Sequence, residues 1–570
     1  MNALQTFTDY LKFDPEHPLL FTQLYFWVFF GAVLGIFSLI HKRLAWRNAF
    51  LFFVSIFFYY KTSGAFFVIL LFSTFSDFFI GNLLFRSNKE NSRKAWLALS
   101  VFLNLFVLIY FKYAYFFTES FNSMLGTQYE PVNYFAKWSN GFFGTEFRVD
   151  KIILPVGISF YTFQTMSYAI DIYRRKLEPV KNIFDFGFYV AFFPQLVAGP
   201  IVRATEFIPQ IYKPYTLSRF QFGLALFWIL NGLLKKTILS DYLAINFIDR
   251  VFANPASYTG FENLMALYGY SLQVYADFSG YTDIAIGVAI LMGFSLPVNF
   301  DAPYKATNTG DFWKRWHISL STWLKDYLYI PMGGNRGATI FTYIAFFGLL
   351  FFACLLAASW LFTGIALGII SIFWIATRIW PTFRLWLVTN INLMVTMLVG
   401  GLWHGASWNF VIWGGLNGLG IVCYKLWRKI SPWESKNTWY KRAWAVFLTF
   451  TFISFTRIWF RSGSKNTWEE MNEVHDIWQE LFAANAMLKK ILFELDFTIA
   501  PQVMAAFWNV FAVMILGFII HWLPSAWKNR YREWFASSSI YTMAVLVLIS
   551  IFVLYQVLSA GMQPFIYFQF

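Results

Sequence analysis

Two of the six histidines in this 570-residue chain carry the first indication of chemistry. His404 lies in a stretch with hardly any charge, where Gly400, Gly401 and Gly405 allow another backbone or a substrate to approach closely. An ionisable side chain at membrane depth is costly, so it is a candidate functional residue by default. The alternative is a core histidine that is hydrogen-bonded to a carbonyl of a neighbouring helix.

The second candidate, His317, lies between residues 311 and 331 in a segment rich in tryptophan and basic residues. Read as one helix, this segment places apolar residues at three- and four-residue spacing and its cations mainly on another side. Those residues are Trp313, Trp316, Leu320 and Trp323 on the apolar face, and Lys314, Arg315 and Lys325 on the other. Such a helix commonly lies on a membrane surface. The functional alternative is a wall that carries His317 inward and holds cations near an anionic donor.

The remaining histidines are expected to be solvated or interfacial, because they lie in a terminal segment, in a loop or at the edge of a span. They are His17, His41, His475 and His521. Two histidines 87 positions apart, with no H-E-x-x-H spacing and no cysteine partners, make a weak ligand set, so no metal site is expected. No P-loop, nucleophile elbow or dinucleotide fingerprint is present. A neutral histidine acting as a general base in a buried chamber is the chemistry that remains.

The composition places these histidines in a membrane protein. Hydrophobic residues make up 58% of the chain and charged residues 13%, against about 25% charged in an average soluble domain. The two cysteines, both in apolar runs, exclude a disulfide framework. The net charge of +14 is attributed to cytoplasmic loops that face anionic lipid, and no nucleic-acid partner is expected.

Apolar runs predict an all-α polytopic protein with about 11–14 transmembrane or re-entrant helices. The predicted organisation is N-terminal helices over 1–117, an extracytoplasmic loop over 118–150, a catalytic core over 151–425 and C-terminal helices over 426–570, with an outer loop at 462–503. Basic clusters place the intervening loops in the cytoplasm and the C-terminus outside. Residues 187–215 and 297–337 are irregular yet flanked by spans, which indicates re-entrant or interfacial elements around a chamber; the alternative is ordinary connecting loops.

Four stretches between residues 100 and 420 together resemble the membrane-bound O-acyltransferase family. They are Leu154–Gln164, Phe193–Ile201, the His317 segment through Arg336, and the His404 segment. The resemblance is strongest to the bacterial branch that contains the alginate O-acetyltransferase membrane subunit and the teichoic acid D-alanyl transfer protein. It implies a helical bundle around a central funnel through the bilayer. It also implies that His404 is the catalytic base and that His317 positions the substrate or supports the oxyanion.

The resemblance also implies a donor or substrate channel. The residues assigned to it are Trp313, Lys314, Arg315, Trp316, Trp403, Asn409, Gln195 and Pro200. No bound cofactor is expected; the co-substrate is acetyl-CoA or, as in the D-alanyl branch, the thioester of an acyl carrier protein. The acceptor is an extracytoplasmic glycan such as an exopolysaccharide, with peptidoglycan or teichoic acid as alternatives, and an esterase-like periplasmic partner is expected. The resemblance implies a location in the bacterial inner membrane.

The C-terminus ends in an F-x-Y-x-x-F pattern that is similar to the small partner peptide of the teichoic acid D-alanylation system. This similarity predicts that Tyr567 receives the acyl group outside the membrane and passes it on. The alternative is an aromatic anchor at the membrane border. A rival for the whole chain is a lipid-linked glycan flippase or transporter, which would also need broken helices. The sparse buried charge and the lack of a paired inverted repeat argue against it.

Overall fold

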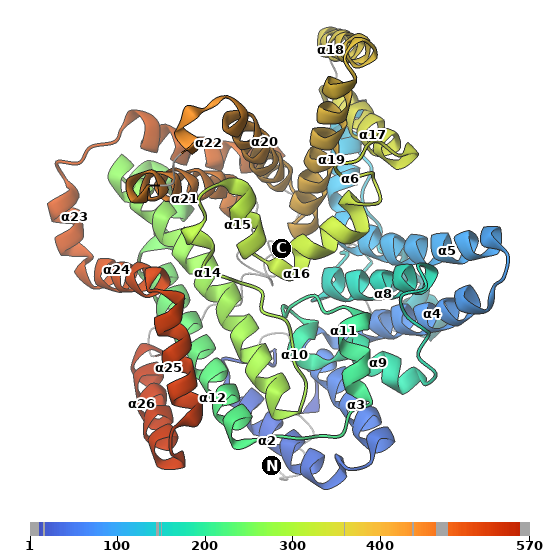
Figure 1. Ribbon diagram of the computed structural model, residues 1–570, viewed down its shortest axis with the longest axis vertical. Helices are drawn as coiled ribbons and strands as arrows, with labels where there is room; N and C mark the ends of the chain where they lie inside the picture. Colours follow the sequence, from blue (N-terminus) through green and yellow to red (C-terminus); the bar gives the residue numbers. More distant parts are fainter. Residues whose placement is uncertain are drawn as a thin grey trace. The chain divides into compact units, whose positions relative to one another are not determined.

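A computed structural model describes residues 11–14, 18–143, 148–149, 151–357, 360–435, 438–462 and 477–558 (Figure 1). Throughout these ranges the regular structure is helical and no strand is present. The described residues form two compact units. The first unit takes its residues from Met1–Leu108, Pro155–Ala302 and Lys490–Phe568, and the second from Ile109–Leu154 and Pro303–Lys489. The sequence-based division followed chain order, whereas each unit combines distant segments.

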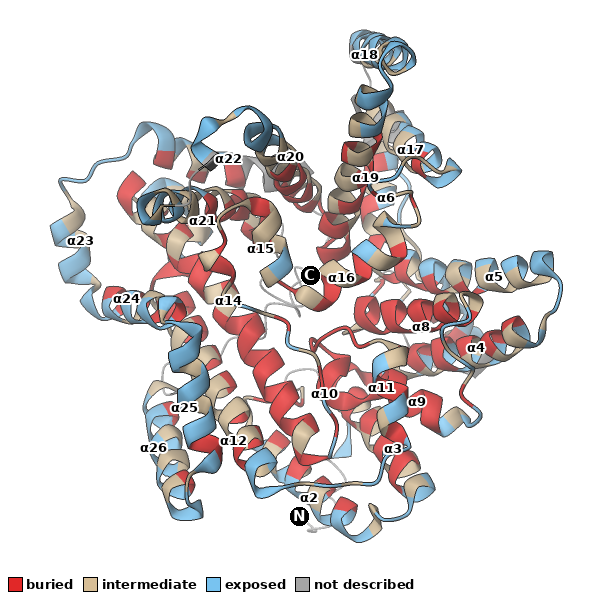
Figure 2. Ribbon diagram, viewed as in Figure 1, coloured by how far each residue is buried: buried red, intermediate tan, exposed pale blue. Residues whose placement is uncertain are grey.

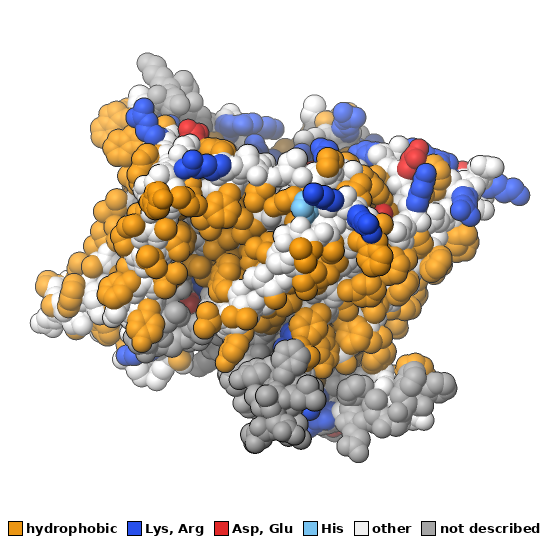
Figure 3. Space-filling model, turned by 90° about the horizontal axis from the view of Figure 1, so that it is seen from below, with side chains coloured by type: hydrophobic (Ala, Val, Ile, Leu, Met, Phe, Trp, Pro, Cys, Tyr) orange, Lys and Arg blue, Asp and Glu red, His pale blue; other side chains and the backbone are white. Residues whose placement is uncertain are grey.

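Eight described helices are long and apolar enough to cross a membrane, and the pair α23 (Ala500–Ala506) and α24 (Trp508–Trp522), bent by 95°, qualifies as a ninth. Three further apolar helices are shorter, at Leu24–Ile40, Ile340–Phe351 and Thr363–Ile379. Hydrophobic side chains cover most of the surface in Figure 3, and Lys and Arg side chains gather along one edge. The prediction of an all-α polytopic membrane protein is confirmed.

The first unit contains fifteen helices among its described residues. They are α2 (Leu24–Ile40), α3 (Leu44–Ser63), α4 (Phe67–Arg86), α5 (Glu90–Leu108), α8 (Ile158–Tyr173), α9 (Ile183–Ala191), α10 (Phe193–Leu196), α11 (Ala204–Ile211), α12 (Arg219–Leu234), α13 (Asp249–Ala253), α14 (Gly260–Leu291), α23 (Ala500–Ala506), α24 (Trp508–Trp522), α25 (Ser525–Ser537) and α26 (Ile540–Leu558). The π-helices η3 (Lys235–Asp241) and η4 (Ala244–Ile248) extend α12. The irregular segment 187–215 contains α10 and α11 and is largely buried, as backbone at membrane depth must be.

Helix α14 forms the core of the first unit and is buried along most of its length (Figure 2). It lies beside α12 at a spacing that only glycine permits, because a Cβ on Gly232 would lie 2.4 Å from the carbonyl oxygen of Gly280. Four residues after Gly232, the Lys236 ammonium is buried between two carboxylates. Its Nζ atom lies 2.7 Å from Oδ1 of Asp241 and 2.5 Å from Oδ1 of Asp277. Charge is therefore buried in the first unit, which removes one of the sequence arguments against a transporter.

The second unit contains the remaining helices and both candidate histidines. Its helices are η2 (Ile109–Tyr113), α6 (Ala114–Leu125), α7 (Tyr134–Phe143), α15 (Thr309–Arg315), α16 (Ile318–Leu324), η7 (Lys325–Tyr329), α17 (Ile340–Ala357), α18 (Trp360–Ile379), α19 (Pro381–His404), α20 (Trp408–Ile430), α21 (Trp439–Ser462) and most of α22 (Ile477–Phe493). Helices α6 and α7 occupy part of 118–150, which the sequence analysis treats as a loop. The predicted apolar run 386–425 is two helices, α19 and α20, with a break at residues 405–407.

Candidate active site

Helices α19 and α20 hold His404 at the point where the chain reverses. A Cβ on Gly401 would lie 2.3 Å from the carbonyl oxygen of Phe410, and one on Gly414 would lie 2.4 Å from that of Met397, so both glycines are needed for this close packing. Beyond His404, a Cβ on Gly405 would meet the Phe410 ring at 2.1 Å. The backbone approach predicted from these glycines is thus made by the second arm of the hairpin.

Aromatic rings enclose the His404 imidazole, whose residue is 3% exposed. The ring centroids of Trp403 and Trp413 lie 5.0 Å from that of His404, and the Phe460 centroid on α21 lies 5.3 Å away. Trp403 and Trp413 are therefore brought together with His404, as a tryptophan-walled pocket requires. These neighbours exclude water and place the imidazole in a medium of low polarity.

His317 lies beside His404, although 87 residues separate them in the chain. Their ring centroids are 6.3 Å apart, and His317 is also 5.6 Å from Trp403. His317 is 0% exposed. It lies outside the helices long enough to span the membrane. Burial first, and then the interaction with the neighbouring His404 imidazole, lower the pKa of His317 well below its usual range. Its imidazole is therefore neutral near pH 7.

The backbone at His317 is left-handed, with φ of 43° and ψ of 56°. The prediction of one continuous helix over 311–331 is therefore wrong, because α15 ends at Arg315 and α16 begins at Ile318. A residue with a Cβ in this conformation costs of order 1–3 kcal/mol, and such strain clusters at functional sites. The break turns the imidazole toward His404 and Trp403, which a straight helix with its tryptophans on one face does not explain.

The four residues before His317 have different environments. Trp313 donates from Nε1 to the Oδ1 atom of Asn417 at 3.3 Å and lies 5.5 Å from Trp413, so it contributes to the wall around His404. Trp316 is buried against Phe312. Lys314 is exposed, and Arg315 pairs with Asp311 at 3.0 Å. The two tryptophans thus pack into the site region, whereas Lys314 is exposed and Arg315 forms an ion pair with Asp311.

Asn409 is the most distinctive polar residue near the reversal. It is 0% exposed, and neither atom of its side-chain amide has a hydrogen-bond partner among the described residues. A buried amide without partners costs free energy, so such a group calls for an explanation. An amide that lies five residues beyond His404 is well suited to a substrate oxygen.

Two residues that the sequence analysis missed hold the end of α19 in place. The Lys112 ammonium donates to the carbonyl oxygens of Trp403 at 2.6 Å and His404 at 3.1 Å. The Tyr113 hydroxyl donates to the carbonyl of Leu402 at 2.5 Å. The last carbonyls of a helix have no partners within it, so these donors complete the hydrogen bonding of α19 beside the catalytic candidate. A lone lysine in the apolar run 95–117 was the available signal.

We expect Lys112→Met to lower the free energy of unfolding by about 1–3 kcal/mol, because it leaves two buried carbonyls without their donor. Lys137→Met is the matched control, since Lys137 is exposed on α7 of the same unit. Thermal unfolding of both variants in detergent measures the difference. Equal melting temperatures would contradict the capping role of Lys112.

Arg457 is a third residue missed by the sequence analysis. It is buried on α21, and its guanidinium carbon lies 4.5 Å from the Trp316 ring centroid and 5.6 Å from that of Tyr304. Such cation–π stacking stabilises a charge that burial would otherwise penalise. Arg457 thus brings a permanent positive charge next to Trp316, where the sequence analysis expected Lys314 and Arg315 to supply it.

The other predicted site residues lie elsewhere or outside the described residues. Gln195 and Pro200 belong to the first unit, where Gln195 is buried and donates to the carbonyl of Tyr189 at 2.9 Å. Their part in a donor channel stays a prediction. Tyr567 lies outside the described residues, as do His17 and His475. Among the residues that are described, no three His, Cys, Asp or Glu side chains gather as a metal site would require.

Fold and site therefore define a polytopic helical membrane protein with two buried, facing histidines. Residues 172–355, which include His317, match the model of the membrane-bound O-acyltransferase family. A probable alginate O-acetylase of Azotobacter vinelandii is 39% identical over 332 residues, covering 58% of this chain and 53% of that protein. One from Pseudomonas aeruginosa is 35% identical over 404 residues, covering 70% of this chain and 65% of that protein.

A peptidoglycan O-acetyltransferase of Helicobacter pylori is 30% identical over 434 residues, covering 72% of this chain and 69% of that protein. The matched part of the chain thus spans about half to two thirds of the length of these curated relatives. The chain belongs to the membrane-bound O-acyltransferase family.

Proposed function

We propose that this protein is a membrane O-acetyltransferase. It moves an acetyl group from a cytoplasmic thioester to a hydroxyl of an extracytoplasmic polysaccharide. The single observation that carries the proposal is the pair of buried imidazoles, 6.3 Å apart between ring centroids, inside an aromatic enclosure. The names of the relatives, which are O-acetylases and an O-acetyltransferase, support acetyl over D-alanyl transfer.

In the proposed reaction, His404 accepts the proton of the acceptor hydroxyl while its oxygen attacks the thioester carbonyl carbon. The C–O bond forms, the carbonyl electrons move to oxygen, and the tetrahedral intermediate carries an oxyanion. As the C–S bond breaks, the imidazolium returns its proton to the thiolate. Two atoms that contact one oxygen at about 3 Å lie no more than about 6 Å apart. An imidazole nitrogen lies about 1 Å from its ring centroid, so rings with centroids 6.3 Å apart can place one nitrogen of each ring within this distance.

The neutral His317 imidazole and the Asn409 amide supply N–H donors for the oxyanion. A donor already in place when charge develops is worth more than one that must reorient, and a dry site strengthens it. Burial of both side chains and the lack of a partner for the Asn409 amide among the described residues support this role. Arg457 and the tryptophans around it line the approach of an anionic donor such as acetyl-CoA.

The remaining parts of the proposal concern location and partners. The protein lies in the bacterial inner membrane with its C-terminus outside, and an esterase-like periplasmic partner carries the acetyl group to the glycan. Tyr567 is the acceptor within the chain, forming an acetyl-tyrosine ester at the outer face. The funnel, the channel roles of Gln195 and Pro200, and the division into a catalytic core over 151–425 belong to the same proposal.

Radiolabelled acetyl-CoA, supplied to proteoliposomes without acceptor, tests the transfer. We expect label on wild-type protein, none on His404→Ala and none on Tyr567→Phe. Label that survives Tyr567→Phe but requires His404 would keep the enzyme and remove the tyrosine carrier. The D-alanyl alternative predicts label only from the carrier-protein thioester.

The buried ion cluster around Lys236 favours one second candidate, a lipid-linked glycan flippase. A flippase would move labelled lipid-linked glycan between leaflets without consuming thioester. Lipid movement that is unaffected by His404→Ala would support it.

A further inference from the structure

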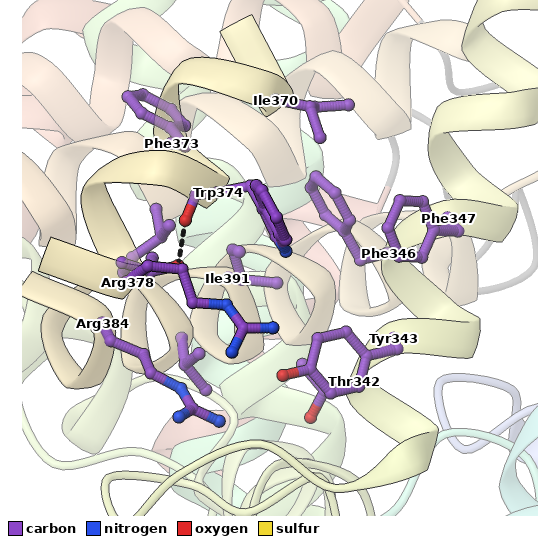
Figure 4. Close-up of a pocket in the computed structure, with 13 residues that line it drawn as sticks. Thr342, Tyr343, Phe346, Phe347, Ile370, Phe373, Trp374, Arg378, Arg384 and Ile391 are labelled. Carbon is purple, nitrogen blue, oxygen red and sulfur yellow. Dashed lines mark hydrogen bonds between the residues drawn. The ribbon is translucent and has the colours of Figure 1, made fainter. Parts of the chain in front are cut away.

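A cavity of about 390 Å³ lies within the second unit among α17, α18 and α19 (Figure 4). Aromatic and branched aliphatic side chains form most of its wall, including Phe346, Phe347, Ile370 and Phe373. These three helices expose large apolar side chains, and α18 is exposed along nearly its whole length (Figure 2). The cavity therefore opens from a surface suited to contact with lipid chains.

Two arginines give this apolar cavity a strongly charged side. In Figure 4 the guanidinium groups of Arg378, near the end of α18, and Arg384, near the start of α19, extend toward the same side of the cavity, where Tyr343 presents its hydroxyl. Among the described residues neither guanidinium forms a hydrogen bond or an ion pair, and Arg378 only stacks on Trp374 at 5.2 Å. Both arginines are exposed, so their two positive charges are available, without a carboxylate partner among the described residues, to an anion at the mouth of the cavity.

The position of Arg384 reinforces this reading. The first turn of α19 contains no acidic residue, and Arg384 places a cation near the helix N-terminus, where the helix dipole disfavours positive charge. Arg384 therefore does not stabilise α19 through the helix dipole. Arginine is suited to phosphate because its planar guanidinium can donate two parallel N–H bonds to the phosphate oxygens.

We propose that this cavity binds the phosphodiester of a membrane phospholipid. Arg378 and Arg384 pair with the phosphate, Tyr343 donates to one of its oxygens, and the acyl chains lie along the wall formed by α17 and α18. A lipid is favoured over a soluble phosphate because most of the wall is apolar. In addition, the bend between α18 and α19, from Ile379 to Pro381, ends an apolar helix at the depth where the lipid headgroups are expected. The site is independent of the two histidines and of the proposed transfer reaction.

Native mass spectrometry of the full-length protein in detergent, titrated with phosphatidylglycerol, tests the proposal. We expect Arg378→Gln/Arg384→Gln to weaken binding at least about tenfold, because it removes both charge-assisted pairs. The matched control is Arg428→Gln/Arg442→Gln, which removes two exposed arginines that do not line the cavity and is expected to bind like wild type. Equal affinity of the two double variants would overturn the proposal.

A further variant and two competition measurements identify the source of the phosphate and distinguish lost binding from misfolding. Arg378→Lys/Arg384→Lys keeps both charges but loses the paired N–H geometry, so an intermediate affinity is expected. Diacylglycerol, which lacks phosphate, is expected not to compete. Displacement of the lipid by equimolar inorganic phosphate or by coenzyme A would overturn the lipid assignment in favour of a soluble phosphate.

Discussion

His404→Ala is expected to lower acetyl transfer by about 10³-fold while leaving the protein folded. General base catalysis by a positioned side chain contributes about 10²–10⁴-fold, and the substitution removes the imidazole that Trp403, Trp413 and Phe460 surround. The measurement is release of coenzyme A from acetyl-CoA in proteoliposomes with an added glycan acceptor. Near-normal turnover would contradict the assignment of His404.

A control variant distinguishes the loss of a catalytic base from the loss of a buried aromatic ring. The expectation of a solvated or interfacial His521 is wrong, because this residue is buried on α24 of the first unit, where its ring lies 4.7 Å from that of Tyr275. His521→Ala removes the same number of atoms from a buried position, and we expect it to retain turnover within about threefold while its melting temperature falls as far as that of His404→Ala. Equal losses of activity in the two variants would attribute the His404 effect to folding.

Three substitutions at His317 are expected to separate its ring from its backbone. His317→Ala removes an oxyanion donor and keeps the strained left-handed backbone, so turnover falls by about 10²-fold. His317→Gly loses the same donor but tolerates φ of 43°. Its free energy of unfolding is therefore expected to be about 1 kcal/mol higher than that of the alanine variant, and its activity equally low. His317→Asn keeps an N–H donor and tolerates the backbone, so turnover stays within about tenfold of wild type.

The pH dependence of stability supplies a readout that a purely steric role would not change. Burial lowers the pKa of His317 in the folded protein, whereas in the unfolded chain it titrates near 6.5. The unfolded chain therefore binds the extra proton first, and the free energy of unfolding falls as the pH drops below about 6.5. His317→Asn lacks this proton. A stability profile for His317→Asn identical to that of wild type between pH 6.5 and 5 would contradict burial of a neutral histidine.

Sequence reasoning singled out two candidate residues for chemistry because their types are unusual in their surroundings. A histidine between glycines in an apolar run and a second histidine among tryptophans and cations are anomalies that periodicity does not explain. The glycines next to His404 were read as sites of close approach, and the structure shows that approach at Gly401 and Gly405. Composition was sufficient for the membrane class and the all-helical fold.

The same reasoning failed where the backbone departs from its local preference. The spacing of Trp313, Trp316 and Trp323 favours one amphipathic helix, yet the chain breaks at His317. A left-handed residue is stabilised by contacts that surround it in three dimensions, here with Trp403 and His404 from α19. Helical periodicity describes only neighbours along the chain, so it cannot reveal such a break.

The sequence by itself determined the class of protein and the helical fold, and it singled out the two histidines as candidates. Apolar length, low charge and residue type are properties of the chain and do not depend on which helices meet. Only the tertiary structure decided that His317 faces His404, that Lys112 holds the carbonyls at the end of α19, and that Arg457, not Lys314, places its charge against Trp316. These pairings join segments as far as 292 positions apart, and such contacts are set by packing, for which a single sequence carries no periodic signal.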